Sequence, residues 1–194
     1  DRMTEFLPHP LNGEFAGRRC DNRQSFVWWL YPAYLLEKTD PQAQSLARLL
    51  DYSFEPVHDC CLGVFENKLG GRICVQGYYP WTFLQNLSRS AQLKSIMRWL
   101  SKDSLPGYIA SFHKTNLWIR QPQNDQIALA FTNASFDPAD NVILMLRTNC
   151  KIIRLYDMEC NQTILQSDET DGPYQKFVIP HIDPWQIRLL VTEP

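Results

Sequence analysis

The pattern of hydrophobic residues changes at Leu105-Pro106-Gly107, and this change constrains the fold more than any other feature of the sequence. Before it, residues 90–101 place apolar side chains at helical spacing. After it, short apolar segments with alternating polar positions continue to the end of the chain. Proline and glycine break the helical pattern at the junction. We therefore expect two modules, an N-terminal one over residues 1–104 and a C-terminal one over residues 105–194.

The C-terminal module is predicted to be an all-β antiparallel sandwich. Segments such as 116–120 and 126–131 combine β-branched and aromatic residues with an alternating pattern. Clusters rich in Pro, Asn and Asp follow them, at residues 121–125 and 137–141, and these residue types favour turns. Short strands separated by turns at this spacing are typical of β-sandwiches.

The last strand of this module is expected to begin after Asp183-Pro184. Trp185 has the parity of the apolar residues that follow it, so the pattern places Trp185 in the core and exposes Arg188. On this interpretation, loss of the Trp185 side chain destabilises the module severely. The residues expected to face the core are Trp185, Ile187, Leu189 and Val191.

The N-terminal module is expected to be an α/β fragment, which makes the predicted class of the whole chain α+β. Asp40-Pro41 is typical of a helix start, and the apolar residues after it predict a helix over 41–51. Residues 60–66 and 71–77 favour two strands joined by a hairpin turn, because the residues between them include Asn67 and Gly70. A second helix and a loop-like opening segment are expected over residues 90–101 and 1–25.

The second helix is expected to be amphipathic. Arg89, just before it, is expected on the polar side. The apolar side is predicted to contain Leu93, Ile96, Met97 and Leu100.

Charge and composition argue against several classes of partner. The chain has 19 basic and 21 acidic side chains and a formal net charge of -2, so it lacks the basic footprint of a nucleic-acid-binding protein. No apolar run of about 18 residues is present, so no membrane-spanning segment is predicted. The chain opens without an initiator Met or a signal-peptide pattern, which suggests an excised or processed piece of a longer protein.

The six cysteines are expected to remain free thiols, because a chain of this length can be stabilised by its core without disulfides. Free thiols and the missing signal pattern together favour a cytoplasmic location. The residues concerned are Cys20, Cys60, Cys61, Cys74, Cys150 and Cys160.

No catalytic residue, metal site or cofactor is predicted. The densest cluster of metal-ligating residue types is His58-Asp59-Cys60-Cys61, but adjacent residues of a strand point to opposite faces and do not converge on one ion. Glu55, Asp59 and Glu66 are the carboxylates considered for glycoside cleavage, and Glu66 lies at a hairpin end, where a solvated carboxylate is ordinary. A cysteine-dependent hydrolase stays open as an alternative, which a thiol of depressed pKa beside a histidine would support.

Aromatic residues carry a carbohydrate-binding hypothesis. Tyr78, Tyr79 and Trp81 follow a predicted strand, in a loop at the end of a sheet, where binding groups are common. Aromatic faces stack on sugar rings as they do on other apolar faces. The alternative is that Tyr79 and Trp81 fill the junction between the helix and the sandwich. The candidate carbohydrate-binding residues are Tyr78, Tyr79, Trp81 and Trp118.

The stretch from Leu62-Gly63-Val64-Phe65-Glu66 through Gly70-Gly71-Arg72 to Trp81 resembles the closing hairpin of the glutamine-amidotransferase-like domains found downstream of the barrel in several bacterial glycoside hydrolases. The sandwich after it, whose last strand begins with Pro184-Trp185, is similar to the C-terminal domains of many glycosidases. The resemblance covers residues 60–194. The nucleophile elbow and the His-Glu pair of active amidotransferases have no counterpart in this sequence.

The resemblance implies a non-catalytic C-terminal region of a larger glycoside-hydrolase-like polypeptide. Its work would be structural: capping a barrel, packing at an oligomer interface or helping to shape a substrate cleft. The implied partners are the remainder of the polypeptide or further copies of the chain. A free-standing carbohydrate-binding module and a cysteine-dependent hydrolase are the alternatives.

Overall fold

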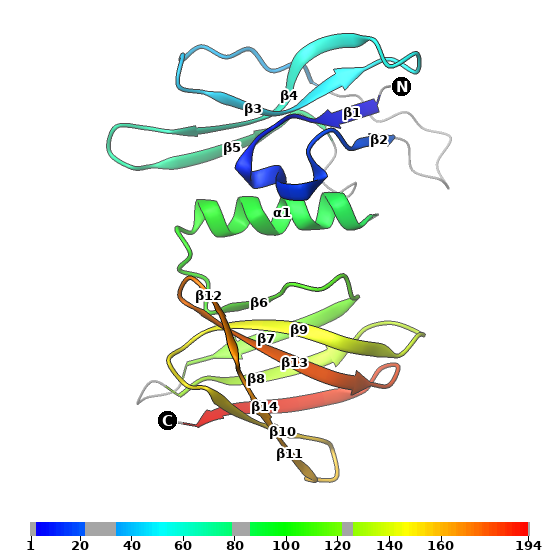
Figure 1. The fold of residues 1–194 in the computed structure, drawn as a ribbon, viewed down its shortest axis with the longest axis vertical. Helices are drawn as coiled ribbons and strands as arrows, with labels where there is room; N and C mark the ends of the chain where they lie inside the picture. Colours follow the sequence, from blue (N-terminus) through cyan, green and yellow to red (C-terminus); the bar gives the residue numbers. More distant parts are fainter. Residues whose placement is uncertain (1–2, 22–33, 79–85, 122–125, 194) are drawn as a thin grey trace. The chain divides into compact units, whose positions relative to one another are not determined.

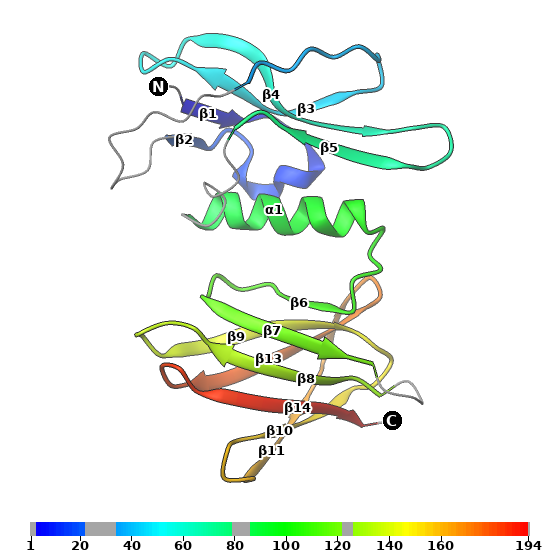
Figure 2. The same cartoon turned by 180° about the vertical axis from the view of Figure 1, so that it is seen from behind.

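The chain forms two compact units in the computed structural model, Asp1–Lys102 and Asp103–Pro194 (Figures 1 and 2). Both units are mostly β, and the described part of the chain contains one α-helix and one 3-10 helix. The described part of the chain therefore has less helix than the predicted α+β class implies. The residues that the structure describes are 3–21, 34–78, 86–121 and 126–193.

The N-terminal unit is built on a five-stranded sheet in which every pair of neighbouring strands is antiparallel. Its strand order is β2-β1-β3-β4-β5, and Figure 1 shows the α-helix α1 and the 3-10 helix η1 on one side of the sheet. The elements are β1 (Met3–Phe6), η1 (Pro10–Phe15), β2 (Arg19–Asp21), β3 (Gln44–Leu50), β4 (Pro56–Glu66), β5 (Arg72–Gln76) and α1 (Leu87–Leu100).

Three expectations for this unit are wrong. The sheet is antiparallel, so it is not the α/β fragment that was expected, and residues 1–25 contain β1, η1 and β2 in place of a loop. Residues 44–50 form β3 and not a helix. The Asp40 carboxylate accepts from the Gln42 backbone N–H at 2.8 Å and closes a turn, and β3 then pairs with β1 and β4. Pairing on both sides, with bulges that bury residues of both parities, overrides the helical spacing.

The predicted hairpin is confirmed as β4 and β5, which pair from Leu62↔Gln76 to Glu66↔Arg72. The Asn67 side chain accepts from the backbone N–H groups of Leu69 (2.9 Å) and Gly71 (2.8 Å), and Gly70 adopts a positive φ of 78°. These are the turn properties for which Asn and Gly are selected.

The predicted second helix is confirmed as α1, but its buried face differs from the expected one. Asn86 caps the helix by accepting from the Arg89 backbone N–H at 2.9 Å. Arg89 is fully buried, whereas Met97, expected in the apolar stripe, is exposed. The reason is a layer of polar contacts between α1 and the elements packed against it.

Arg89 lies at the centre of this layer. Its guanidinium donates to Thr4 Oγ1 (3.0 Å), to the Asp21 carbonyl (3.1 Å) and to the Cys20 carbonyl (3.4 Å), and its Cζ lies 5.3 Å from the centre of the Tyr78 ring. One turn along, Gln92 donates to Asn12 Oδ1 at 2.7 Å. Asn12 in turn donates to the carbonyls of Leu7 and Leu46. The layer thus joins α1 to β1, β2, β3 and η1.

The C-terminal unit is the antiparallel sandwich expected from the sequence. One sheet has the order β11-β10-β14-β8-β7 and the other β12-β13-β9-β6, and side chains from both sheets form one buried core that includes Phe131, Leu144, Phe177 and Leu190. The strands are β6 (Gly107–Ile109), β7 (Thr115–Arg120), β8 (Ala128–Asn133), β9 (Ala139–Arg147), β10 (Ile152–Tyr156), β11 (Gln162–Gln166), β12 (Glu169–Asp171), β13 (Tyr174–Ile182) and β14 (Ile187–Glu193).

The expected orientation of β14 is wrong. Leu190 and Thr192 are buried, each 1 % exposed, while Trp185, Ile187 and Leu189 are 56, 40 and 47 % exposed. Trp185 lies in a turn before the strand, with a positive φ of 61°, so strand parity does not extend to it. Thr192 is accommodated in the core because its hydroxyl accepts from the Ile127 backbone N–H at 2.9 Å.

The first prediction concerns the polar layer. Arg89→Met removes the donors of three hydrogen bonds from a buried site, and we expect the free energy of unfolding of the N-terminal unit to fall by about 3 kcal/mol or more. Urea denaturation followed by circular dichroism measures the change. Arg18→Met, at an exposed position of the same unit, is the control and should stay within about 0.5 kcal/mol of wild type. Equal effects of the two substitutions would contradict the role of Arg89.

The second prediction uses two neighbours on β14. Leu190→Ala creates a cavity in the sandwich core and should destabilise the C-terminal unit by about 2–5 kcal/mol. Leu189→Ala removes a half-exposed side chain from the solvent-exposed side of the sheet and should change stability by less than about 1 kcal/mol. Thermal denaturation measures both changes. A larger loss of stability in Leu189→Ala than in Leu190→Ala would contradict the observed orientation of β14 and support the orientation expected from the sequence.

Candidate functional site

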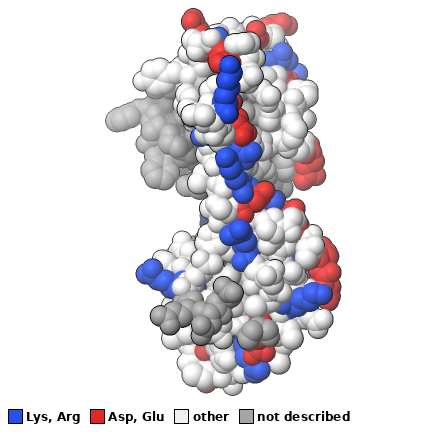
Figure 3. All heavy atoms as spheres, turned by 90° about the vertical axis from the view of Figure 1, so that its left-hand side faces the viewer, with Lys and Arg blue, Asp and Glu red and all other residues white. Residues whose placement is uncertain are grey.

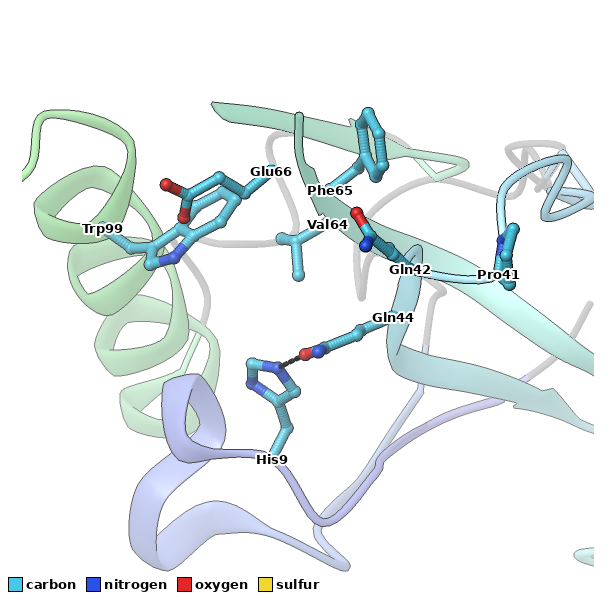
Figure 4. Close-up of a pocket in the computed structure, with 8 residues that line it drawn as sticks. All are labelled: His9, Pro41, Gln42, Gln44, Val64, Phe65, Glu66 and Trp99. Carbon is cyan, nitrogen blue, oxygen red and sulfur yellow. Dashed lines mark hydrogen bonds between the residues drawn. The ribbon is translucent and has the colours of Figure 1, made fainter. Parts of the chain in front are cut away.

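An open hollow of about 390 Å³ lies in the N-terminal unit (Figure 4). Its volume is within the range of ligand pockets, about 300–1,000 Å³. We call it the Trp99 hollow. It combines two amides, an imidazole, a carboxylate and an indole with three apolar side chains. The residues that line it are His9, Pro41, Gln42, Gln44, Val64, Phe65, Glu66 and Trp99.

His9 fixes the orientation of Gln44 at one side of the hollow. His9 caps η1, since its Nδ1 accepts from the Leu11 backbone N–H at 3.1 Å. A nitrogen that accepts carries no proton, so the neutral ring holds its proton on Nε2, which donates to Gln44 Oε1 at 2.6 Å. The Gln44 amide oxygen is thereby occupied, and its NH₂ group remains as a donor at the hollow.

Arg72 holds Glu66 and Trp99 at the opposite side. Its Nε donates to Glu66 Oε2 at 2.8 Å, and its Nη1 donates to the Trp99 carbonyl at 2.6 Å. The guanidinium also lies over the Trp99 ring, with Cζ 5.0 Å from the ring centre. Strand β5 therefore positions one side chain from β4 and one from α1.

A second open hollow, of about 530 Å³, adjoins the first and shares Pro41, Gln42 and Phe65 with it. Its other lining residues are Asp40, Asn67, Lys68 and Leu69. The turn before β3 and the β4–β5 hairpin thus border both hollows. Their walls can hold a ligand that has hydroxyl groups and apolar faces.

The four aromatic residues named from the sequence are not brought together in the described structure. Tyr78 is 4 % exposed and packs in the core of the N-terminal unit, so its ring face is not available for stacking. Tyr79 and Trp81 lie outside the described residues. Trp118, on β7 of the C-terminal unit, is 57 % exposed.

Trp118 belongs to an exposed apolar surface on the β11-β10-β14-β8-β7 sheet, which we call the outer face. Cross-strand partners place side chains on the same face of a sheet, and the register aligns Trp118 with Ala130, Ala130 with Leu189, and Leu189 with Tyr156. Ile187 and Ile164 on neighbouring rows are also exposed. Arg154 and Glu193 form an ion pair on the same face.

The cysteines bear on the alternative of a cysteine-dependent hydrolase. All six lie in the described part of the chain, and none of them forms a disulfide. Burial raises the pKa of Cys61 to about 12 and that of Cys74 to about 11, so both are protonated at neutral pH. His58 contacts the Leu36 carbonyl at 3.0 Å through its Nε2. Within the described residues, no group of three or more His, Cys, Asp or Glu side chains could hold a metal ion.

Charged side chains do not gather by sign on the visible surface. Figure 3 shows Lys and Arg interspersed with Asp and Glu on the face of the molecule that it presents. Helix α1 has 14 residues, and no described helix has the length and hydropathy to cross a membrane.

His181 lies beside two carboxylates in the C-terminal unit. Its Nδ1 is 2.5 Å from Asp140 Oδ1, and its Nε2 is 3.1 Å from Asp183 Oδ1. The hydrogen bond to Asp140, followed by that to Asp183, raises the pKa of His181 above its usual value of 6.5. Phe136 and Trp185, from the loops beside these carboxylates, pack edge to face with ring centres 5.5 Å apart.

The fold of the chain is similar to part of a solved enzyme structure. No protein-family model and no curated protein matches the sequence. Among solved structures, the chain is similar to alpha-L-fucosidase isoenzyme 2 from Paenibacillus thiaminolyticus, with a TM-score of 0.59 at 12% sequence identity. The match covers 99% of this chain and 31% of the fucosidase chain. The chain therefore shares its fold with part of a larger glycoside hydrolase, as the sequence resemblance implied, and at this identity the likeness concerns the fold alone.

The third prediction is a pH effect at His181. Because its folded pKa is raised, the ion pairs contribute stability that is complete below the unfolded pKa of about 6.5 and is lost as pH rises through the folded value. NMR titration of the ring protons should give a midpoint above 6.5. Asp140→Asn should move that midpoint down, whereas Asp137→Asn, a nearby exposed control, should leave it in place. A wild-type midpoint at or below 6.5 would contradict the geometry.

Proposed function

We propose that this chain is a non-catalytic accessory region of a larger glycoside-hydrolase-like protein and that it acts as a structural support at an interface. The similarity of nearly the whole chain to a part of a fucosidase supports this proposal. The further assignment of the N-terminal unit to an amidotransferase-like domain rests on the hairpin sequence alone. That residues 1–104 and 105–194 are separately folding modules stays a prediction.

The outer face is the observation that carries the proposal. Monomeric soluble proteins rarely expose large contiguous apolar patches, and such patches commonly mark protein interfaces. Here Trp118 on β7, and Leu189 and Ile187 on β14, are each 40 % or more exposed, and the two strands are separated by β8. A sheet surface of this composition suits contact with another protein, and such a contact would bury side chains of β7, β14 and β10 together. We therefore propose that the outer face is the contact surface of the accessory region.

Two alternatives have less support. A carbohydrate-binding module using the four aromatic residues retains Trp118 as an exposed ring, but Tyr78 is buried in the core. A cysteine-dependent hydrolase needs a thiolate, and the raised pKa values of Cys61 and Cys74 work against one at those positions.

The fourth prediction tests the outer face through self-association. Two copies of the isolated chain can cover their outer faces with each other, so sedimentation velocity should show concentration-dependent association. Leu189→Glu puts a charge at the centre of the face and should weaken the association about tenfold or more, which corresponds to about 1.4 kcal/mol. Leu69→Glu is the matched control, because Leu69 is 96 % exposed at the hairpin turn of the other unit.

Two results would contradict the proposal. A chain that stays monomeric, or one that associates equally well with Glu at position 189, would contradict self-association through the outer face. Hydrolysis of an aryl α-L-fucoside by the purified chain would show that the region is catalytic.

A further inference from the structure

We propose that the Trp99 hollow is a binding subsite for a neutral, hydroxyl-rich ligand the size of a single sugar residue. This inference goes beyond the accessory role, because it assigns the N-terminal unit a ligand of its own. It rests on the donors, acceptors and apolar surfaces around the hollow, and not on the outer face.

Two hydrogen-bond donors border the hollow. The Gln44 NH₂ group is one, since the His9 Nε2 proton occupies the amide oxygen. The Trp99 indole N–H is the other, and Figure 4 shows the indole nitrogen on the side of the ring that faces His9. Within the described residues, neither the Gln44 amide nitrogen nor the indole nitrogen has a hydrogen-bond acceptor. Both donors therefore remain available to ligand oxygens.

The acceptor is the Glu66 carboxylate. Its Oε2 accepts from Arg72, while no described side chain donates to its Oε1. A hydroxyl group can both donate to Oε1 and accept from an N–H, so vicinal hydroxyls match this mixture of groups. Because Arg72 already pairs with Glu66, the hollow has no net excess of either charge from this pair. The pairing favours a neutral ligand over an anion or a cation.

Apolar side chains complete the site. Val64, Phe65 and Pro41 also line the hollow, and apolar side chains can contact the C–H groups of a sugar ring. Phe65, Pro41 and Gln42 also line the adjoining hollow. A ligand of more than one sugar could therefore continue past Phe65 into the second hollow.

The fifth prediction is tested by NMR with the whole chain. The probes are methyl glycosides of glucose, galactose and fucose, added up to about 10 mM because a single-sugar site should bind at the millimolar level. The chain has six tryptophans, and the indole N–H signal of Trp99 is identified by its loss in Trp99→Phe. We expect at least one glycoside to shift the Trp99 signal with saturation, and sodium phosphate at equal ionic strength to leave it in place.

Two variants and a control make the test specific. Trp99→Phe keeps an aromatic ring but removes the N–H, and Gln44→Glu keeps the side-chain length but replaces the donor with a carboxylate. Each should weaken glycoside binding about fivefold or more while the melting temperature stays near that of wild type. Trp185→Phe, a matched tryptophan substitution at an exposed position of the other unit, should leave the affinity unchanged.

Several outcomes would overturn the proposal. They are the absence of any saturable shift with the glycosides, a shift confined to the Trp118 signal, and a phosphate shift as large as that of the best glycoside. Unchanged affinity in both Trp99→Phe and Gln44→Glu would also overturn it. None of these outcomes depends on whether the outer face self-associates, so the two proposals fail independently.

Discussion

The N-terminal unit depends on a buried guanidinium. Arg89 enters the space between α1 and the strands, where an apolar side chain would be ordinary, and donates to a hydroxyl and two backbone carbonyls of β1 and β2. Polar groups removed from water need hydrogen-bond partners. The guanidinium N–H groups of Arg89 and the carbonyls of the short edge strand β2 supply each other with those partners. Gln92 extends the same contacts to η1 through Asn12. The layer fixes where α1 lies, and with it the position of Trp99 at the far end of the helix.

Local signals explain which elements could be predicted from the sequence. Asn67 and Gly70 specify a turn through their own chemistry, and Asn86 caps α1, so the β4–β5 hairpin and the helix were predictable. Strand β3 was not, because helical spacing in a short apolar run is ambiguous until its partners are known. The face of β14 was missed because the parity with more apolar residues, which includes Ile187 and Leu189, is the exposed one. The buried parity contains Thr192, whose hydroxyl is accommodated by its hydrogen bond with the Ile127 backbone N–H.

The candidate site could be predicted only in part. Glu66 and Trp118 were named from the sequence. Glu66 lines the Trp99 hollow, and Trp118 is exposed on the outer face. His9, Gln44 and Trp99 were missed, because they come from distant segments and form no local motif. Their convergence follows from β3 being a strand and from Arg89 setting the helix position. Because a helix was predicted where β3 lies, neither the sheet of the N-terminal unit nor the place of Gln44 at the hollow could be predicted.

A crystal structure of the chain grown with a saturating methyl glycoside would show directly whether a buried polar layer holds α1 so that Trp99 and Gln44 together form a ligand site. We expect one sugar ring in the hollow, with hydroxyl oxygens about 2.7–3.2 Å from Trp99 Nε1 and from Gln44 Nε2. We also expect Arg89 in contact with β1 and β2. An empty hollow, or a helix whose Arg89 faces solvent, would contradict this arrangement.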